Sequence, residues 1–361
     1  MPAQCRSNEL LLTTLVLDEY DNVSSTFDGS GSITDQSSAH LRGSIELLQY
    51  RGPLNYTDEL AWRLVTATRN RLLNDSWHST DRIKSVQEIW GSGGAGRPRG
   101  PAVEADTLAL KLCWLKHLHT SALADSLSRC RSRHTETVDV EKLKGIVAQA
   151  SHLANECAVV KNAMPASWQP LTAPASPLAK SPQAVSVYEN MPVAVHSQLS
   201  VANSVNRQRL TELGCISLIS SCLANIALSG ELQLQLPHEP LPFTLLARVQ
   251  VLVDEICAPV PFLTVDVQEG ASGAIAIPMS TVAPVSAMEI DGQCTMPKNK
   301  TTHAQQIVTS GLYMMYMTLK AVLEFQMSDG IIEIIGNSLR AGQKEWVVRQ
   351  VNRLSRILQI T

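Results

Sequence analysis

The stretch that decides the fold reads VEKLKGIVAQASHLANECAVV and spans residues 140–160. Apolar side chains recur in it every three or four residues, at Leu143, Val147, Ala150, Leu153 and Cys157. This spacing places them along one face of an α-helix and leaves the polar residues on the other faces. The pattern therefore predicts an amphipathic helix whose apolar face packs into a core.

The same period returns along most of the chain. It predicts helices over residues 10–20, 38–51, 57–72, 108–127, 187–228, 244–256, 302–325 and 343–360. The long segment 187–228 is expected to break near Gly214. Strict alternation of apolar and polar residues persists almost nowhere, so the sequence predicts an all-α fold, a multi-helix array larger than a simple bundle with long irregular loops.

Segments rich in glycine, proline and small residues interrupt this periodicity. We expect a loop or insertion over residues 91–106, a linker over 170–182 and a variable loop over 265–300. A chain of 361 residues corresponds to two or three domains of usual length, or to one large helical domain with loops. We predict the latter, a single helical domain over residues 1–361.

Two helices are expected to carry arginines on their outer faces. Residues 57–72 are expected to turn outward Arg63, Arg69 and Arg71, and residues 343–360 to turn outward Arg349, Arg353 and Arg356. The inner faces are expected to carry Leu60, Leu64, Ala67 and Leu72 in the first helix and Val347, Val351, Leu354 and Leu358 in the second. The arginines of the second helix are candidates for contact with phosphates or an acidic partner, although solvation is the commoner role of such a face.

Composition is typical of a globular protein that does not bind nucleic acid through its overall charge. Hydrophobic residues make up 44% and charged residues 17% of the 361 positions, which is the balance of a chain with a core. The formal net charge of −3 gives no basic footprint for nucleic acid.

The cysteines are scattered and form no C-x-x-C pair. They are Cys5, Cys113, Cys130, Cys157, Cys215, Cys222, Cys257 and Cys294. Most lie in apolar helical contexts, which favours small buried thiols over a disulfide framework or a zinc site.

Other patterns that could carry chemistry are incomplete. Residues 91–96 fit G-x-G-x-x-G, but a dinucleotide site needs a preceding strand and a following helix, which Pro98 and Pro101 are expected to prevent. His117 and His119 point to different helix faces, and Cys130 with His134 supplies only two of the four ligands of a tetrahedral metal site.

Neighbouring carboxylates such as Asp254 and Glu255 diverge on a helix, so we expect them to solvate its polar side. We therefore predict no enzyme and no catalytic, cofactor-binding or metal residue. The apolar run at residues 10–17 is not typical of a signal peptide because Glu9 precedes it and no cleavage site follows. The runs at 213–228 and 311–325 are too short or too polar to cross a bilayer, and we expect an intracellular chain.

Four short motifs follow one another in a fixed order. They are HLRGSIELLQYRG at residues 40–52, MPASW at 164–168, DEICAPVPF at 254–262 and QKEWVV at 343–348. This order resembles the regulatory region of fungal zinc-cluster transcription factors. A looser match comprises Tyr188, Ala194 and Arg207. The resemblance extends over nearly the whole chain.

The resemblance implies an all-α regulatory region that acts in the nucleus on a metabolic or secondary-metabolite gene set. Its partners would be proteins of the transcription machinery and a small-molecule inducer, with no membrane. The family's six-cysteine zinc cluster is not present among the eight cysteines, so DNA would be reached only indirectly or through an N-terminal cluster that this sequence lacks. A fragment of a longer factor and an incomplete gene model are both consistent with that departure. A helical scaffold or adaptor, a small-molecule sensor outside transcription, and an enzyme with a cavity between apolar helices stay open as alternatives.

Overall fold

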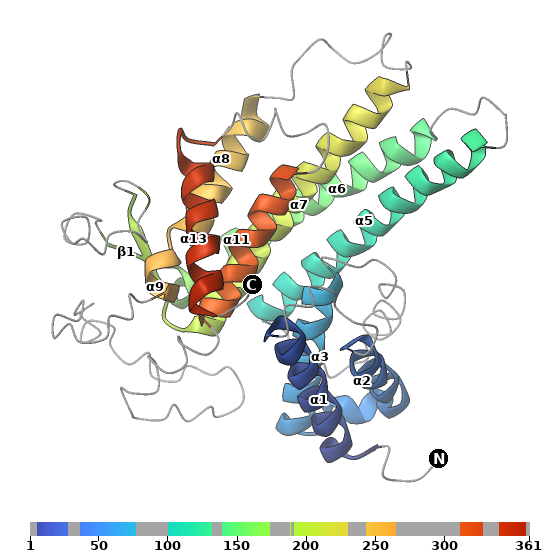
Figure 1. Cartoon of the computed structure of the whole chain (residues 1–361), viewed down its shortest axis with the longest axis vertical. Coiled ribbons are helices and arrows are strands. Elements are labelled where there is room, and N and C mark those ends of the chain that lie inside the picture. The colour runs from blue at the N-terminus through green and yellow to red at the C-terminus, as the bar shows by residue number, and fades with distance from the viewer. Residues whose placement is uncertain are drawn as a thin grey trace. The chain divides into compact units, whose positions relative to one another are not determined.

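The fold class is all-α, as the sequence predicts. The computed structural model describes residues 6–27, 37–76, 100–131, 139–173, 188, 191–229, 243–264, 311–327 and 339–358. Helices make up 86% of these residues, and the strands among them form a small sheet. Figure 1 shows the described helices as coiled ribbons and the strands as arrows.

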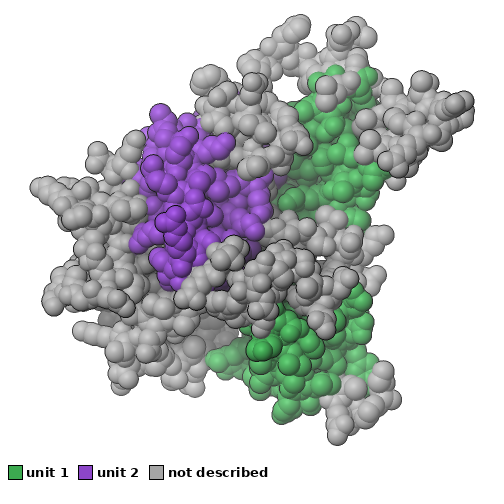
Figure 2. Space-filling model, viewed as in Figure 1, with its two compact units in different colours: residues 1–156, 218–236, 359–361 green, residues 157–217, 237–358 purple. Residues whose placement is uncertain are grey.

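Backbone contacts divide the chain into two compact units. Unit 1 comprises residues 1–156, 218–236 and 359–361, and unit 2 comprises residues 157–217 and 237–358. Figure 2 shows the described part of unit 1 in green and that of unit 2 in purple. Where the sequence led us to expect one domain over residues 1–361, the contacts thus group around two separate centres.

Among the residues that the structure describes, unit 1 contains four complete helices and one short 3-10 turn. These are α1 (Asn8–Phe27), α2 (Ser37–Arg51), η2 (Gly52–Tyr56), α3 (Glu59–Ser76) and α5 (Pro101–Arg131), and α6 (Val140–Ala163) begins in the same unit. Helix α1 packs against α2 and α3, and α3 packs against α5. The bounds of α6 match the predicted helix closely because its apolar period is unbroken.

The core of unit 1 forms between the faces that the helical period predicts. Leu41, Ile45 and Leu48 of α2 are each at most 4% exposed and pack with Leu11 of α1. Helix α2 ends at Gly52, whose φ of 51° lies in the left-handed region that glycine adopts without strain. The predicted glycine stop is therefore confirmed.

The predicted faces of α3 are partly wrong. Leu60 is 51% exposed, whereas Arg69 is 3% exposed. The guanidinium of Arg69 lies 2.5 Å from a carboxylate oxygen of Asp106 on α5, and Arg71 donates to Asp18 on α1 at 2.7 Å. These two arginines are directed inward because each finds a buried carboxylate, so of the three expected on the outer face only Arg63 is well exposed.

Residues 101–106, expected in a loop, are helical. Helix α5 begins at Pro101, and Glu104 lies in its first turn. Proline is tolerated there because the first backbone N–H groups of a helix have no partner within it, and an acidic side chain favours the helix N-terminus. Residues 91–99 lie outside the described residues, as do residues 265–300.

Unit 2 combines helices with a two-stranded antiparallel sheet. Its elements are η3 (Ala166–Trp168), β1 (Leu171–Ala173), β2 (Val193–Val195), α7 (Leu199–Leu228, which continues into unit 1), α8 (Phe243–Cys257), α9 (Val260–Thr264), α11 (Leu312–Met327) and α13 (Gln343–Ile357). Strand β1 lies in the expected linker 170–182, and its Leu171 pairs with Val195. Residues 174–182 are not described.

Helix α11 is the centre of contacts in unit 2. It packs against α8, α9 and α13, and α9 packs against β2. Figure 1 shows α11 and α13 side by side in orange and red. The backbone N–H of Ala194 on β2 donates to the carbonyl of Ala258 at 3.0 Å, so the sheet is fastened to the turn between α8 and α9.

Helix α7 is continuous, so the predicted break near Gly214 is wrong. Nearly every residue from 201 to 220 is buried, and this packing outweighs the low helix propensity of one glycine. By length and composition Leu199–Ala227 could cross a membrane, but 72% of its most apolar window is buried within the fold. This is the pattern of a core helix.

Two leucines of α3 test the assignment of its inner face. We expect Leu72→Ala to lower the free energy of unfolding by about 3 kcal/mol, because the fully buried side chain leaves a cavity in the core. Leu60→Ala, on the exposed face of the same helix, should change it by less than about 1 kcal/mol. Urea unfolding followed by circular dichroism measures both. Equal effects of the two substitutions would contradict this placement of α3.

Candidate functional site

The most unusual feature of unit 2 is a run of buried polar residues on α7. Each residue in the run is at most 8% exposed. We call it the polar belt, and its members are Asn206, Arg207, Gln208, Arg209, Thr211 and Glu212. Buried charged groups are costly unless they are paired and hydrogen-bonded, so the belt determines which neighbours α7 must have.

Glu255 of α8 neutralises the belt on one side. Its carboxylate accepts from Arg209 Nε at 3.2 Å and from Lys161 Nζ, at the end of α6, at 2.6 Å. Arg209 Nη1 also donates to Asn206 Oδ1 at 3.0 Å. Burial lowers the pKa of Arg209, and the charge of Glu255 opposes that change. One carboxylate thus joins α6, α7 and α8.

Glu212 and Arg248 form a second link between α7 and α8. Arg248 Nε and Nη2 donate to the two carboxylate oxygens of Glu212, both at 2.6 Å. Such two-pronged pairs fix geometry as well as charge. The hydrogen bonds from Arg248 to Glu212 raise the pKa of Arg248 above its usual range.

Two further groups complete the surroundings of the belt. The side-chain amide of Gln208 donates to the backbone carbonyl of Cys157 on α6. His196, which follows β2, is 4% exposed. Burial, together with the nearby charge of Arg209, lowers the pKa of His196 to about 4. The imidazole is therefore neutral at physiological pH and adds no charge beside Arg209.

Asp254 is the acceptor of a second polar cluster in unit 2. It receives hydrogen bonds from Gln250 Nε2 at 2.7 Å, Gln343 Nε2 at 2.8 Å and Arg340 Nη2 at 2.8 Å. The expectation that Asp254 and Glu255 are solvated is therefore wrong. They diverge as predicted, but each is directed to its own set of donors, which include the buried side chains of Gln343 and Arg209.

Tyr188 fastens the start of α13. Its hydroxyl donates to the backbone carbonyl of Ala341 at 2.7 Å, and its ring lies 5.7 Å from that of Trp346 in an edge-on arrangement. Gly342 precedes the helix with a φ of 79°, which favours glycine. The N-terminal end of α13 is thereby fixed in position.

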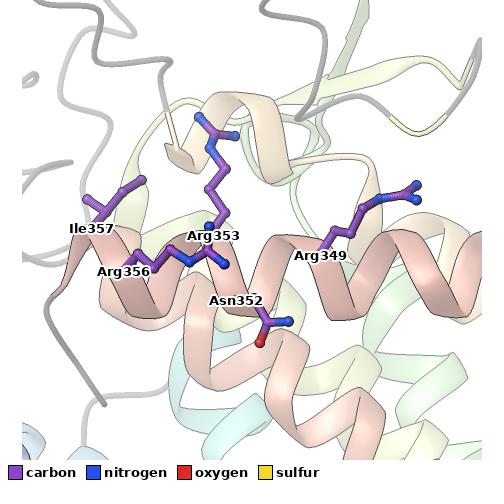
Figure 3. A pocket seen from close by; sticks show the side chains of 5 residues that line it. All are labelled: Arg349, Asn352, Arg353, Arg356 and Ile357. Atoms are coloured by element: carbon purple, nitrogen blue, oxygen red, sulfur yellow. The ribbon is translucent and has the colours of Figure 1, made fainter.

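The outer face of α13 forms an open depression of about 510 Å³. We call it the arginine groove, and it is lined by Arg349, Asn352, Arg353, Arg356 and Ile357 (Figure 3). The outward direction predicted for the arginines is confirmed, since Arg349 and Arg356 are exposed and Arg353 is half-buried. The inner stripe is confirmed in part, since Val347 and Leu354 are fully buried whereas Val351 and Leu358 are half-buried.

Of the histidines and the glycine motif considered from sequence, the structure describes His117 and His119. His117 and His119 are both half-buried on α5, and burial lowers the pKa of His119. His134, the side chain of Cys130 and the glycine motif at residues 91–96 lie outside the described part. Within that part, no group of three or more histidine, cysteine, aspartate or glutamate residues is placed to hold a metal.

The described cysteines are buried thiols, as predicted. Cys113, Cys157, Cys215, Cys222 and Cys257 are buried, and no disulfide joins them. Burial raises the pKa of Cys222 to about 12 and that of Cys257 further. A thiol with a raised pKa is a poor nucleophile and a poor metal ligand. Cys5 and Cys294 are not described.

Comparison with known proteins gives no relative: no family model, no curated protein sequence and no solved structure matches this chain. The features described here therefore rest on the chain itself. Sequence reasoning found the arginine groove but missed the polar belt. A signal for the belt was present in the sequence, since NRQRLTE at residues 206–212 interrupts an otherwise apolar stretch.

Removing the charge of Glu255 tests its role as the shared acceptor. We expect Glu255→Gln to lower the free energy of unfolding by about 2 kcal/mol, because Arg209 would keep a buried charge without its anion. Glu141→Gln, at an 82% exposed side chain paired only with Lys144, should cost less than about 0.5 kcal/mol. Urea unfolding of both variants measures the difference. Equal effects of the two substitutions would contradict the role of Glu255 as the shared acceptor.

The depressed pKa of His196 predicts a pH dependence of stability. The unfolded chain binds a proton at His196 below about pH 6.5, whereas the folded chain does so only below about pH 4. Stability from this residue is therefore complete above pH 6.5 and falls as the pH drops toward 4. Between about pH 7 and pH 5 we expect a loss of about 2 kcal/mol that His196→Gln abolishes.

The exposed His152 supplies the matched control for this measurement. Its side chain is 77% exposed, so His152→Gln should keep the full pH dependence of the unmodified chain. Urea unfolding at both pH values, on all three proteins, gives the comparison. A pH dependence that survives in His196→Gln would contradict a neutral buried imidazole.

Proposed function

We propose that this chain is the regulatory region of a transcription regulator, a helical body that acts through contacts with other proteins or an inducer to control a metabolic or secondary-metabolite gene set. The observation that supports the proposal best is that three of the four motifs that resemble those of fungal zinc-cluster factors lie in unit 2. The fourth, at residues 40–52, forms α2 and its glycine stop in unit 1.

The motif at residues 164–168 packs against the start of α7. Met164 forms an apolar cluster with Val201 and Val205, and Trp168 packs against that cluster. Immediately before this motif, Lys161 donates to Glu255 of the motif at residues 254–262. Helix α6, which ends just before the first of the three motifs, is thereby tied to the second motif.

The motif at residues 254–262 is tied in turn to the motif at residues 343–348. Asp254 accepts from Gln343, and Gln343 Oε1 accepts from the backbone N–H of Arg340 at 3.2 Å. Tyr188, from the looser match, contacts Trp346. Segments that are far apart in sequence thus form one set of contacts, which favours a common structural origin for their order over coincidence.

A reporter experiment tests the proposal. The full chain is fused to a DNA-binding domain of unrelated origin and expressed in fungal cells with a reporter gene that carries the matching site. We expect reporter expression to change several-fold relative to the DNA-binding domain alone, and a fluorescent fusion of the chain to accumulate in the nucleus.

Two variants connect the reporter to the contacts of unit 2. Asp254→Ala removes the acceptor that joins α8 to Gln343 and Arg340 and should abolish the reporter response. Glu345→Ala, at an exposed residue near the start of α13, should preserve it, with both proteins at equal abundance. An unchanged reporter for the unmodified chain in the nucleus would contradict the proposal and favour a helical scaffold or adaptor.

A further inference from the structure

We propose that the arginine groove of α13 binds an acidic, amphipathic helical segment of a partner protein. This inference extends the proposed function. It rests on that function for one point, namely that the chain has a protein partner. The groove itself is defined by residues Arg349, Asn352, Arg353, Arg356 and Ile357.

The spacing of the cations matches the spacing of side chains on another helix. Arg349, Arg353 and Arg356 follow one another at i, i+4 and i+7, which places them on one face over about 10 Å. In Figure 3, Arg349 lies at one end of the groove and Arg356 at the other. Glutamates repeated at the same interval on a partner helix would meet these guanidinium groups, which bind carboxylates through two parallel hydrogen bonds.

The groove also offers apolar surface. Ile357 is 49% exposed and Val348, on the same outer side of α13, is 37% exposed. The walls consist mainly of carbon, because the aliphatic stems of the arginines form much of the lining. A partner that carries apolar side chains between its carboxylates would cover this surface, whereas a purely polar anion would leave it in water.

The cations of the groove differ from other exposed cations of the molecule. Arg63, Lys111, Lys144 and Lys320 each pair with a carboxylate on their own or a neighbouring helix. In the described residues, no carboxylate pairs with Arg349 or Arg356. The guanidinium groups of Arg349 and Arg356, two turns apart on one helix face, are therefore available to an external anion.

The helix that carries the groove is held rigidly. Trp346, Val347 and Leu354 bury its opposite face, and Tyr188 fixes its N-terminal end. Side chains on a supported helix lose less freedom on binding than those on a loop. The arginines are therefore presented to a partner on a firm support.

An acidic peptide fits the groove better than nucleic acid does. The net charge of the chain is −3, so its overall field repels a polyanion at long range. The basic stripe is also short, and proteins that bind duplexes usually have a basic domain with cations spread over a wider face. An acidic helix needs only the local charge and the apolar surface beside it.

Fluorescence anisotropy with the full chain tests the inference. The probe is a fluorescein-labelled synthetic helix with glutamates at i, i+4 and i+7 and leucines between them. We expect saturable binding that weakens as salt is added, since screening reduces the attraction between exposed charges. The double variant Arg349→Ala, Arg356→Ala should weaken binding about tenfold.

The matched control removes two cations elsewhere. Arg63→Ala with Lys144→Ala changes the net charge by the same amount on exposed parts of α3 and α6, and it should leave affinity within about twofold. Circular dichroism must show the same melting temperature for both double variants and the unmodified chain. Equal weakening by the two double variants would overturn the inference, because it would reflect total charge alone.

Two other probes separate the alternatives. A peptide with serines in place of the leucines should bind at least about fivefold more weakly, and equal affinity would overturn an amphipathic partner. Competition by a DNA duplex at the same concentration as the peptide would contradict the inference that the partner is a protein. Absence of saturable peptide binding would contradict it as well. These measurements use no reporter gene, so a negative binding result would leave the proposed role in transcription intact. Conversely, an unchanged reporter together with peptide binding would contradict the role in transcription but keep the groove as a peptide-binding site.

Discussion

Unit 2 depends on the pairing of charges that lie inside it. Arg209 and Glu212 are each 5% exposed, and a buried charge without a counter-ion costs several kcal/mol. Glu255 satisfies Arg209, and Arg248 satisfies Glu212. Both partners lie on α8, so α7 and α8 have one register in which all four charges are neutralised. Apolar packing alone would allow helices to slide with less penalty, because it is not directional.

This register determines where α13 lies. Helix α8 carries Asp254 next to Glu255, and Asp254 holds Gln343 and Arg340 at the start of α13. The consecutive carboxylates point in different directions, so one side of α8 faces the polar belt while another holds α13. The arginine groove is therefore positioned by the same helix that neutralises α7, and a change in the pairing of α7 would be felt at α13 through α8.

Local patterns were predictable from the sequence, and long-range pairs were not. The stripe of Leu41, Ile45 and Leu48 and the outward arginines of α13 follow from helical period alone. Arg69 and the polar belt were missed because a charged residue is normally exposed, and its burial depends on a partner such as Asp106 or Glu255 that lies far along the chain. The predicted helix begins later than α5 does, because Pro101 was expected to prevent a helix. In the structure Pro101 is the first residue of α5, a position where proline is tolerated.

The composition of α7 has a consequence for the chain during its synthesis. When α7 emerges from the ribosome, α8 and α13 have not yet been made, and its apolar length resembles that of an anchor segment. Arg209 and Glu212 distinguish it, since an ionised side chain within a bilayer costs free energy on insertion. The charges that later join α7 to α8 thus also make insertion of the nascent helix into a membrane less favourable.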